Sequence, residues 1–585
     1  MVLEPLPRDA RRRGQPLRST PARHRPARSA VGDRDHGGVR PAARRGRGLR
    51  QEAQGRRRAG GAAPLRWRDP RLLQHGRHDR HGEDGGAVRG RRPPQGIRAV
   101  ELIGDLTLAG LAHAVIGVTL SLHVLLNKHR PVSAVLWLAS LWAFPFIGAV
   151  VYLCFGVDQV ERGAAARIAC RRLQRELGLG PGADATGAPV PDDPRAAGRG
   201  VEILDVTNRG RRALSTMGGN RVELLVDGDE FYPALHDAIA SARDSIHLQS
   251  FIIARDATGR ELVGHLASRA RDGISVRLLY DRFGSTYAHY GATFRPARRA
   301  GVKVASISHA SPLRGRFQVN LRNHRKVAVV DGRLGFTGGI NVGDPNLSAR
   351  TSGEPIRDYH LRVTGPAVSE LQLQFAADWS FASGEPPEDL VLARYFPAPE
   401  RTGDALVNVV PGGPYSGGRA LTDLLFAAIG AATTSLRIVT PYFVPNESIL
   451  QAIRAAGLRG VDTRLVVPQL GNHWYVDYAA RSLYTSLLES GVRIFERRPP
   501  FSHAKALVVD GSYAVLGSPN LDYRSLHLNF ETAVEVAEPS FLARLNEQIA
   551  RELAYSVEVS LDAHRARPMA RRLAENFCYL FQPLL

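Results

Sequence analysis

The sequence predicts an α/β protein in which two pseudo-symmetric α/β sandwich domains follow a two-helix transmembrane hairpin. From residue 217 onward, apolar runs of strand length alternate with helical periods, which indicates layered α/β structure with a largely parallel, buried sheet. The order of these runs then repeats once. The expected parts are a basic tail, the hairpin, a linker and two domains, at 1–99, 100–157, 158–214, 215–400 and 401–585.

The positive charge of the chain is concentrated at its N-terminus. The formal net charge is +22, and residues 1–100 contain 26 Arg, no Lys and 9 acidic residues, a difference of 17. Rich in Arg, Gly and Pro and without periodicity, this segment reads as a disordered basic tail or as the product of a gene start assigned too early. The remaining residues are nearly neutral, which disfavours nucleic acid as a partner.

Two long apolar stretches, 106–126 and 132–156, follow the tail. Each is long enough to cross a hydrocarbon core of about 30 Å as a helix. The alternative is a buried helical hairpin in a soluble core. More basic residues follow the second stretch than lie between the two, so the positive-inside rule places the C-terminal region in the cytoplasm.

The Gly- and Pro-rich stretch within 178–200 has the composition of a flexible linker. The three cysteines form no C-x-x-C pair, and no histidines cluster at the spacing of metal ligands. The sequence therefore predicts neither a metal site nor a cofactor.

A ten-residue pattern occurs twice, as "NHRKVAVVDG" and "SHAKALVVDG". Each copy has a His, a Lys two residues later and an Asp-Gly turn, and we expect each His and Lys to project from one face of a strand. Only four lysines occur in the chain, and two of them occupy these patterns. The candidate catalytic residues are His324, Lys326, Asp331, His503, Lys505 and Asp510.

Small residues and an Asn follow each pattern, in "GGIN" and "GSPN". Small residues let the backbone approach a ligand, and Asn and Ser can donate hydrogen bonds to phosphoryl oxygens. Asn341, Ser518 and Asn520 are therefore candidate substrate-binding residues.

Two imidazoles, two ammonium groups and two amides meeting in one site would suit a phosphodiester. One imidazole attacks phosphorus and forms a phosphohistidine, while the other protonates the leaving alkoxide and then deprotonates an incoming hydroxyl. Lysine and asparagine side chains stabilise the added negative charge, so this chemistry requires no metal. The duplication follows, because each copy supplies one of the two imidazoles.

The chain resembles the phospholipase D superfamily, whose motif is H-x-K-x4-D followed by G-G/S-x-N, and more closely the bacterial cardiolipin synthases. Segments such as "TPYFVPNESIL", "RDYHLRVTGPAV" and "RRLAENFCYLFQPLL" carry the likeness. The resemblance implies phospholipase D-like domains and transphosphatidylation between two phosphatidylglycerol molecules, giving cardiolipin and glycerol. It also implies membrane phospholipid as partner and a multi-pass protein of the bacterial inner membrane.

By the same resemblance His324 is the nucleophile and His503 the acid and base, although the reverse assignment stays open. Glu531 resembles the carboxylate that orients the imidazole in the second half, and Asp358 is the candidate in the first; each could instead be a surface carboxylate. Asp331 and Asp510 are expected to hold their turns rather than transfer protons. Arg497 and Arg498 are candidates for contact with lipid headgroups.

Two other functions fit the same motifs. One is a hydrolase of the superfamily that uses water as acceptor and acts on phospholipid or nucleic acid. The other is a non-catalytic membrane scaffold that keeps the fold without turnover. The oligomeric state is not predicted.

Overall fold

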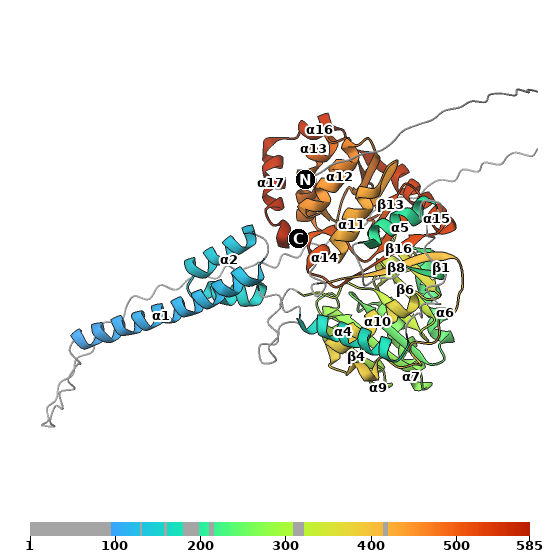
Figure 1. Ribbon diagram of the computed structural model, residues 1–585, viewed down its shortest axis with the longest axis horizontal. Helices are drawn as coiled ribbons and strands as arrows, with labels where there is room; N and C mark the ends of the chain where they lie inside the picture. Colours follow the sequence, from blue (N-terminus) through green and yellow to red (C-terminus); the bar gives the residue numbers. More distant parts are fainter. Residues whose placement is uncertain are drawn as a thin grey trace, which may run out of the picture. The chain divides into compact units, whose positions relative to one another are not determined.

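The computed structural model describes residues 95–128, 131–156, 161–179, 198–209, 216–307, 321–413 and 419–584. The expected basic tail lies outside the described residues up to residue 94. The rest of the chain is shown in Figure 1.

The first half of the catalytic region alternates strands with helices. In chain order its elements are β1 (Met217–Val226), α6 (Asp227–Ser241), β2 (Ser245–Ser250), α7 (Ala257–Arg271), β3 (Ser275–Asp281), α8 (Thr286–Tyr290), α9 (Arg295–Arg299), β4 (Lys303–Ile307), β5 (Val327–Val330), β6 (Leu334–Gly338), β7 (Tyr359–Thr364) and α10 (Val368–Ser383).

The second half repeats this order and adds short C-terminal elements. Its elements are β8 (Ala405–Gly412), α11 (Ala420–Ala431), β9 (Ser435–Val439), β10 (Phe443–Val444), α12 (Glu447–Leu458), β11 (Asp462–Pro468), α13 (Trp474–Leu488), β12 (Arg493–Arg497), β13 (Ala506–Val509), β14 (Tyr513–Gly517), β15 (Leu521–Asp522), α14 (Tyr523–His527), β16 (Glu531–Ala537), α15 (Pro539–Ala554), β17 (Ser556–Glu558), α16 (Leu561–Arg565) and α17 (Met569–Tyr579).

Among the described residues, fifteen of the seventeen strands form one sheet, in which the order of strands is repeated outward from the β8–β1 pair, and β10 and β15 form a separate two-stranded sheet. The order is β17-β12-β11-β9-β13-β14-β16-β8-β1-β7-β6-β5-β2-β3-β4. Strands β8 and β1 join the halves, with Asn220 paired to Ala405. Outward from this seam, the first half runs β1-β7-β6-β5-β2-β3-β4 and the second β8-β16-β14-β13-β9-β11-β12. The two halves inferred from the sequence repeat are therefore related by a pseudo-twofold axis at this seam.

The prediction of a largely parallel sheet is wrong. Of the described strands of this sheet, only β2, β3 and β4 run parallel to one another in the first half, and only β9, β11 and β12 in the second. The strands between these and the seam pair antiparallel. Strand-length apolar runs occur in both kinds of buried sheet, so periodicity alone does not separate them.

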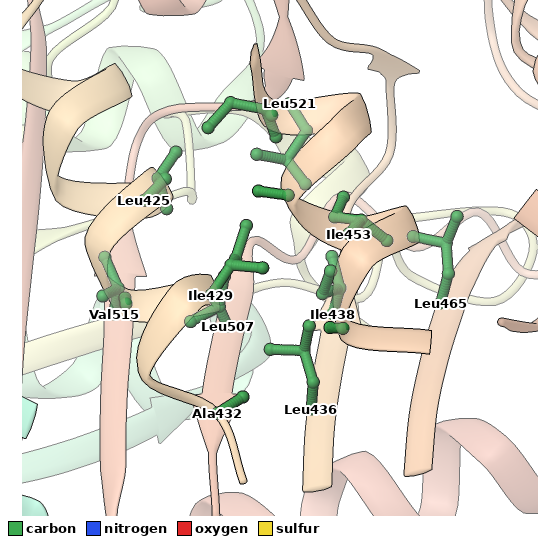
Figure 2. Close-up of a cluster of buried hydrophobic side chains, with 14 of the residues drawn as sticks. Leu425, Ile429, Ala432, Leu436, Ile438, Ile453, Leu465, Leu507, Val515 and Leu521 are labelled. Atoms are coloured by element: carbon green, nitrogen blue, oxygen red, sulfur yellow. The ribbon is translucent and has the colours of Figure 1, made fainter. Parts of the chain in front are cut away.

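Helices cover both faces of each half. A core under α11, α12 and α13 of the second half contains Leu425, Ile429, Ile438, Ile453 and Leu465, which Figure 2 shows converging between strands and helices. A second core is shared: valines of β1 and β7 pack with valines of β8 and β16. Removing this apolar surface from water stabilises the two halves as one body.

The N-terminal helices differ from the expected hairpin. Helix α1 (Gln95–Asn127) contains Thr107–Asn127, which among the described residues is the one segment of 18 or more helical residues apolar enough to cross a membrane. The second stretch is broken into α2 (Pro131–Ala143), α3 (Ile147–Val151) and a π-helical turn, Tyr152–Gly156. Pro145 cannot donate a backbone hydrogen bond, and Phe146 has a φ of 60°, so no continuous helix passes this point.

Two helices lie within the interval expected to be a linker. Helix α4 (Glu161–Glu176) packs against α10, and both oxygens of Glu370 accept hydrogen bonds of 2.5 Å from Arg171. Helix α5 (Arg199–Arg209) packs against α11. Linker residues 158–160, 180–197 and 210–214 lie outside the described residues.

Candidate active site

Both H-x-K motifs lie in the chain just before a strand, not within it. Strand β5 begins at Val327 and β13 at Ala506, each one residue after the motif Lys. Short bridges to the other half hold these segments: Asn323 pairs with Phe530, and Ser502 pairs with Arg357. Each motif histidine therefore lies beside the residue that precedes a carboxylate of the opposite half.

The two histidine–carboxylate pairs cross between the halves. Nδ1 of His324 lies 3.0 Å from both carboxylate oxygens of Glu531, and Nδ1 of His503 lies 2.7 Å from Oδ2 of Asp358. The sequence reasoning had placed each carboxylate with the histidine of its own half, and that pairing is wrong. Glu531 is fully buried and Asp358 is nearly so, so neither is the surface carboxylate that the sequence left open as an alternative, and both contact the imidazoles.

Burial and charge set the protonation of these pairs. Burial lowers the pKa of His324, and the charge of Glu531 opposes this shift. Burial and the neighbouring Lys505 lower the pKa of His503 to about 3. Burial alone would raise the pKa of each carboxyl group. At Asp358 the charges of Lys505 and His503 outweigh burial, and at Glu531 the charge of His324 does so. The pKa of each carboxyl group is therefore lowered. Both carboxylates therefore stay ionised and accept a hydrogen bond from Nδ1–H, which leaves Nε2 available for chemistry.

The two motif lysines are buried beside the histidines. Nζ of Lys326 donates to the carbonyl of His324 at 2.8 Å, and Nζ of Lys505 donates to the carbonyl of His503. Burial lowers the pKa of Lys326 to about 7 and that of Lys505 to about 8. Neither side chain is in the lining of the cavity between the halves, so each lysine acts as a positive charge close to an imidazole.

A cavity of about 560 Å³ lies where the halves meet, and both motif histidines line it. Asn341 and Asn520, predicted from the sequence, also line it. Arg322 and Arg524 are lining residues that the sequence reasoning missed. Burial lowers the pKa of each guanidinium, and Arg322 is further lowered by the charge of Arg524. Arg322 lies two residues before His324, and Arg524 lies four residues after Asn520, so closeness to the motifs in the sequence could have indicated both as site residues. The site suits an anionic group.

Ser518 contacts a carboxylate instead of lining the cavity. It is fully buried, its hydroxyl donates to Glu531, and its backbone N–H donates to Thr532 at 2.9 Å. The matching residue of the first half is Gly339, where a Cβ atom would lie 2.2 Å from Oδ1 of Asp358. The two halves therefore use different residues to place their carboxylates.

Asp331 and Asp510 hold turns outside the cavity lining, as expected for a structural role. Asp331 accepts from the backbone N–H groups of Arg243, Asp244 and Ser245, each at 2.8 Å. Asp510 accepts likewise from the N–H groups before β9 and from Arg199. Both have a positive φ, 53° and 50°. They fix the strand that follows each H-x-K segment.

The two arginines expected at lipid headgroups are not in the cavity lining. Arg497 is buried, and its guanidinium donates to Glu552 and to the carbonyl of Pro500. Arg498 is exposed, but it also lies outside the lining. Both arginines are close to the second motif in the sequence, but this closeness did not predict a place in the cavity lining.

Among the residues that the structure describes, one group of possible metal ligands lies outside the cavity lining, although the sequence suggested none. His236 of α6 and Glu261 and His265 of α7 place one ligand atom each within 4.8 Å of the others. Arg350 forms an ion pair with Glu261 at 2.5 Å. None of its three side chains is in the lining of the cavity that contains the motif histidines.

The fold and the paired motifs are those of the phospholipase D superfamily, and similarity to known proteins identifies the chain as a phosphatidyltransferase. The family model described as "Cardiolipin synthase, PLD-like domain" matches residues 235–379 and 425–553, and the model "Phospholipase D-nuclease N-terminal" matches 115–156. The chain belongs to the cardiolipin synthase family. With α1, this membership makes it a membrane-associated protein whose substrates are phospholipids.

Curated relatives align over nearly their whole length. Cardiolipin synthase A of Pseudomonas aeruginosa (strain LESB58) is 35% identical over 495 residues, 84% of this chain and 98% of that protein. Cardiolipin synthase of Geobacillus kaustophilus is 34% identical over 480 residues, 80% and 91% of the two chains. The crystal structure of phosphatidylserine synthase from Haemophilus influenzae shares the fold, with a TM-score of 0.51 and 14% identity over 66% of this chain and 100% of that one.

Proposed function

We propose that the protein transfers a phosphatidyl group from one phosphatidylglycerol to a second, releasing glycerol and forming cardiolipin through a phosphohistidine. The observation that supports this most directly is the pair of imidazoles lining one cavity, each hydrogen-bonded at Nδ1 to a buried carboxylate. A single phosphorus between two such rings can be attacked by one and supplied with a proton by the other.

In the first step, Nε2 of His324 attacks phosphorus and the bond to the glycerol oxygen breaks. His503 gives its Nε2 proton to the departing alkoxide. In the second step, His503 removes the proton from a hydroxyl of the second phosphatidylglycerol, whose oxygen attacks phosphorus and releases His324. The carboxylates of Glu531 and Asp358 stabilise the positive charge on each ring.

The lysines make proton supply dependent on substrate. Nζ of Lys505 lies 2.7 Å from Nδ1 of His503. When no substrate is bound, the charge of this ammonium group makes protonation of the His503 ring unfavourable. An anionic phosphodiester between the rings offsets this repulsion and favours the protonated ring that the first step needs. Arg322 and Arg524 bring further positive charge to the same anion.

The finer localisation is part of this proposal. A multi-pass anchor in the bacterial inner membrane is supported by the two apolar stretches at 106–126 and 132–156, and a cytoplasmic catalytic region by the larger number of basic residues after these stretches than between them. The domain boundaries at 215–400 and 401–585 are likewise proposed, with the seam between β1 and β8 in their support.

The test is the lipid product formed by the full chain. In bacteria lacking cardiolipin, we expect the wild-type protein to restore it and the His503→Ala variant to fail. With purified protein and labelled phosphatidylglycerol, cardiolipin and glycerol should appear in equal amounts. Phosphatidic acid as the main product would instead establish a hydrolase, and no product from either assay would favour a scaffold.

A further inference from the structure

The mouth of the cavity carries exposed aromatic side chains from both halves. After β3, Phe283, Tyr287 and Tyr290 are 57%, 83% and 71% exposed; we call these the first lip. After β11, Leu470, Trp474 and Tyr475 are 68%, 66% and 39% exposed; these form the second lip. Phe283 and Tyr475 also line the cavity, so both lips adjoin its opening.

The two lips are equivalent positions in the duplicated fold. In the sheet order, β3 lies second from the outer end of the first half, as β11 does among the seven repeated strands of the second. Each strand is followed by a loop that leads into a helix, α8 or α13, whose first turn carries lip residues. Their side chains differ in sequence, yet both places present large exposed rings. A shared environment is the simplest physical reason.

The C-terminal helix α17 extends the second lip. Cys578 of α17 packs in one cluster with Val476 and Ala479 of α13, so the end of α17 lies beside the second lip. Figure 1 shows the two helices side by side. Met569, Leu573 and Phe577, spaced at four residues on α17, are 75%, 63% and 61% exposed and form an apolar stripe. Arginines at 571 and 572 lie on the same helix.

This combination matches the interface of a phospholipid bilayer. Aromatic rings favour the headgroup region, and an amphipathic helix with arginines lies along it with its apolar stripe inserted. At the first lip, the guanidinium of Arg322 lies 4.4 Å from the ring centre of Phe283 and also lines the cavity. A phosphate entering over that ring would meet a positive charge.

We propose that the first lip, the second lip and the stripe of α17 form one surface that inserts into a bilayer interface. Phospholipids then enter the cavity between the lips without leaving the membrane. The inference rests on the proposed function, because it takes phospholipid as the substrate. A bilayer fits better than a second copy of the chain, since each lip contributes a residue to the lining of the cavity that the substrate must enter.

The first test measures the depth of Trp474. The full chain is reconstituted into vesicles of phosphatidylethanolamine and phosphatidylglycerol, with or without bromine on the acyl chains. The difference in tryptophan fluorescence between the wild-type protein and the Trp474→Phe variant gives the emission of Trp474 alone, without that of the four other tryptophans. We expect bromine to lower that emission about twofold, as for a ring at the acyl boundary. Unchanged emission overturns the proposal, and so does a dimer in detergent that Trp474→Ser dissociates.

The second test separates docking from chemistry. For Tyr287→Ser and Trp474→Ser, we expect cardiolipin formation in vesicles to fall about tenfold, while turnover of dispersed dihexanoyl phosphatidylglycerol changes less than about twofold. Leu458→Ser, at the end of α12 and 71% exposed, is the matched control and should change neither. Equal losses with both lipids, or no loss with either, would overturn the proposal. If the proposed function itself is wrong, the result is different: the wild-type protein then makes cardiolipin from neither lipid.

Discussion

Nδ1 of His324 lies 3.0 Å from both carboxylate oxygens of Glu531, a residue 207 positions further along the chain and in the other half. His503 has the reciprocal arrangement with Asp358. A change to the carboxylate of one half should therefore disable the histidine of the other.

Replacing either carboxylate by its amide should lower kcat with little change in KM. An amide neither holds the Nδ1–H tautomer nor stabilises the imidazolium, so we expect Glu531→Gln and Asp358→Asn to lower kcat by about 10²- to 10⁴-fold. The measurement is cardiolipin formation in vesicles. The control is Glu535→Gln. Glu535 is a buried carboxylate of β16 that lies outside the cavity lining and accepts hydrogen bonds from Tyr513 and Thr207.

A substrate with an activated leaving group should separate the two histidines. A nitrophenyl ester of phosphatidic acid needs no proton for its leaving group, so Asp358→Asn should still form the phosphoenzyme. Glu531→Gln should not, because its nucleophile is impaired. Mass spectrometry should place the phosphoryl group on His324. The opposite pattern would reverse the assigned roles, and identical behaviour of both variants would contradict the crossed pairing.

Alanine should be far less acceptable at Gly339 than at Ser518. A Cβ at Gly339 would lie 2.2 Å from Oδ1 of Asp358, so Gly339→Ala displaces that carboxylate from His503. Ser518→Ala removes one hydrogen bond to a charged group, and we expect about a tenfold loss of kcat. Gly339→Ala should lose about a hundredfold or more. Equal losses would show that the spacing around Asp358 is not limiting.

The catalytic motif could be predicted from the sequence because its residues are close together in the chain. The crossing could not, because it depends on bridges between Asn323 and Phe530 and between Ser502 and Arg357, which no local pattern encodes. Ser518 was assigned to substrate for the same reason: its hydroxyl chemistry fits a phosphate, and only the fold directs it to Glu531.

Hydropathy identified the apolar N-terminal stretches but not their helical breaks. The average over 132–156 is high whether or not the helix continues, and the break depends on one proline and one positive φ at Phe146. Arg322 and Arg524 were missed because the chain is rich in arginine, so a single Arg carries little information until its position relative to the cavity is known.

The specificity constant kcat/KM should fall as the pH rises above about 7. Burial holds the pKa of Lys326 at about 7 and that of Lys505 at about 8, so both are charged in mildly acidic solution and lose their protons above these values. The empty cavity then attracts an anionic phosphodiester less strongly, and kcat/KM reports groups of the free enzyme.

Profiles with dispersed dihexanoyl phosphatidylglycerol would check this prediction without effects of the bilayer. Lys303→Gln is the control, because Lys303 is 59% exposed, pairs with Glu385 and should leave the profile unchanged. A value of kcat/KM that stayed level up to pH about 10, the ordinary range for lysine, would show that neither buried ammonium governs binding.

Arg325→Met should strongly destabilise the protein. The Arg325 side chain is fully buried, forms an ion pair with Asp378 of α10, and donates to the carbonyls of Glu531 and Gly412 in the other half. Its loss leaves a buried carboxylate uncompensated, which costs about 3–5 kcal/mol of unfolding free energy.

Chemical denaturation in detergent would measure this effect on Arg325. Arg544→Met is the matched control, because its ion pair with Glu230 is nearly half exposed and should contribute less than about 1 kcal/mol. The double variant Arg325→Met/Asp378→Leu should recover much of the loss. A single variant no less stable than the control would contradict a structural role for this pair.

The seam between β1 and β8 bears on how such an enzyme arises. If each half descends from one shorter chain, two copies of that ancestor had to associate before either histidine met its carboxylate, so the ancestor worked as a symmetric pair. Tandem fusion ended the requirement that both copies be identical. Gly339 could then diverge from Ser518, and Arg325 from Ala504, and each imidazole became free to specialise.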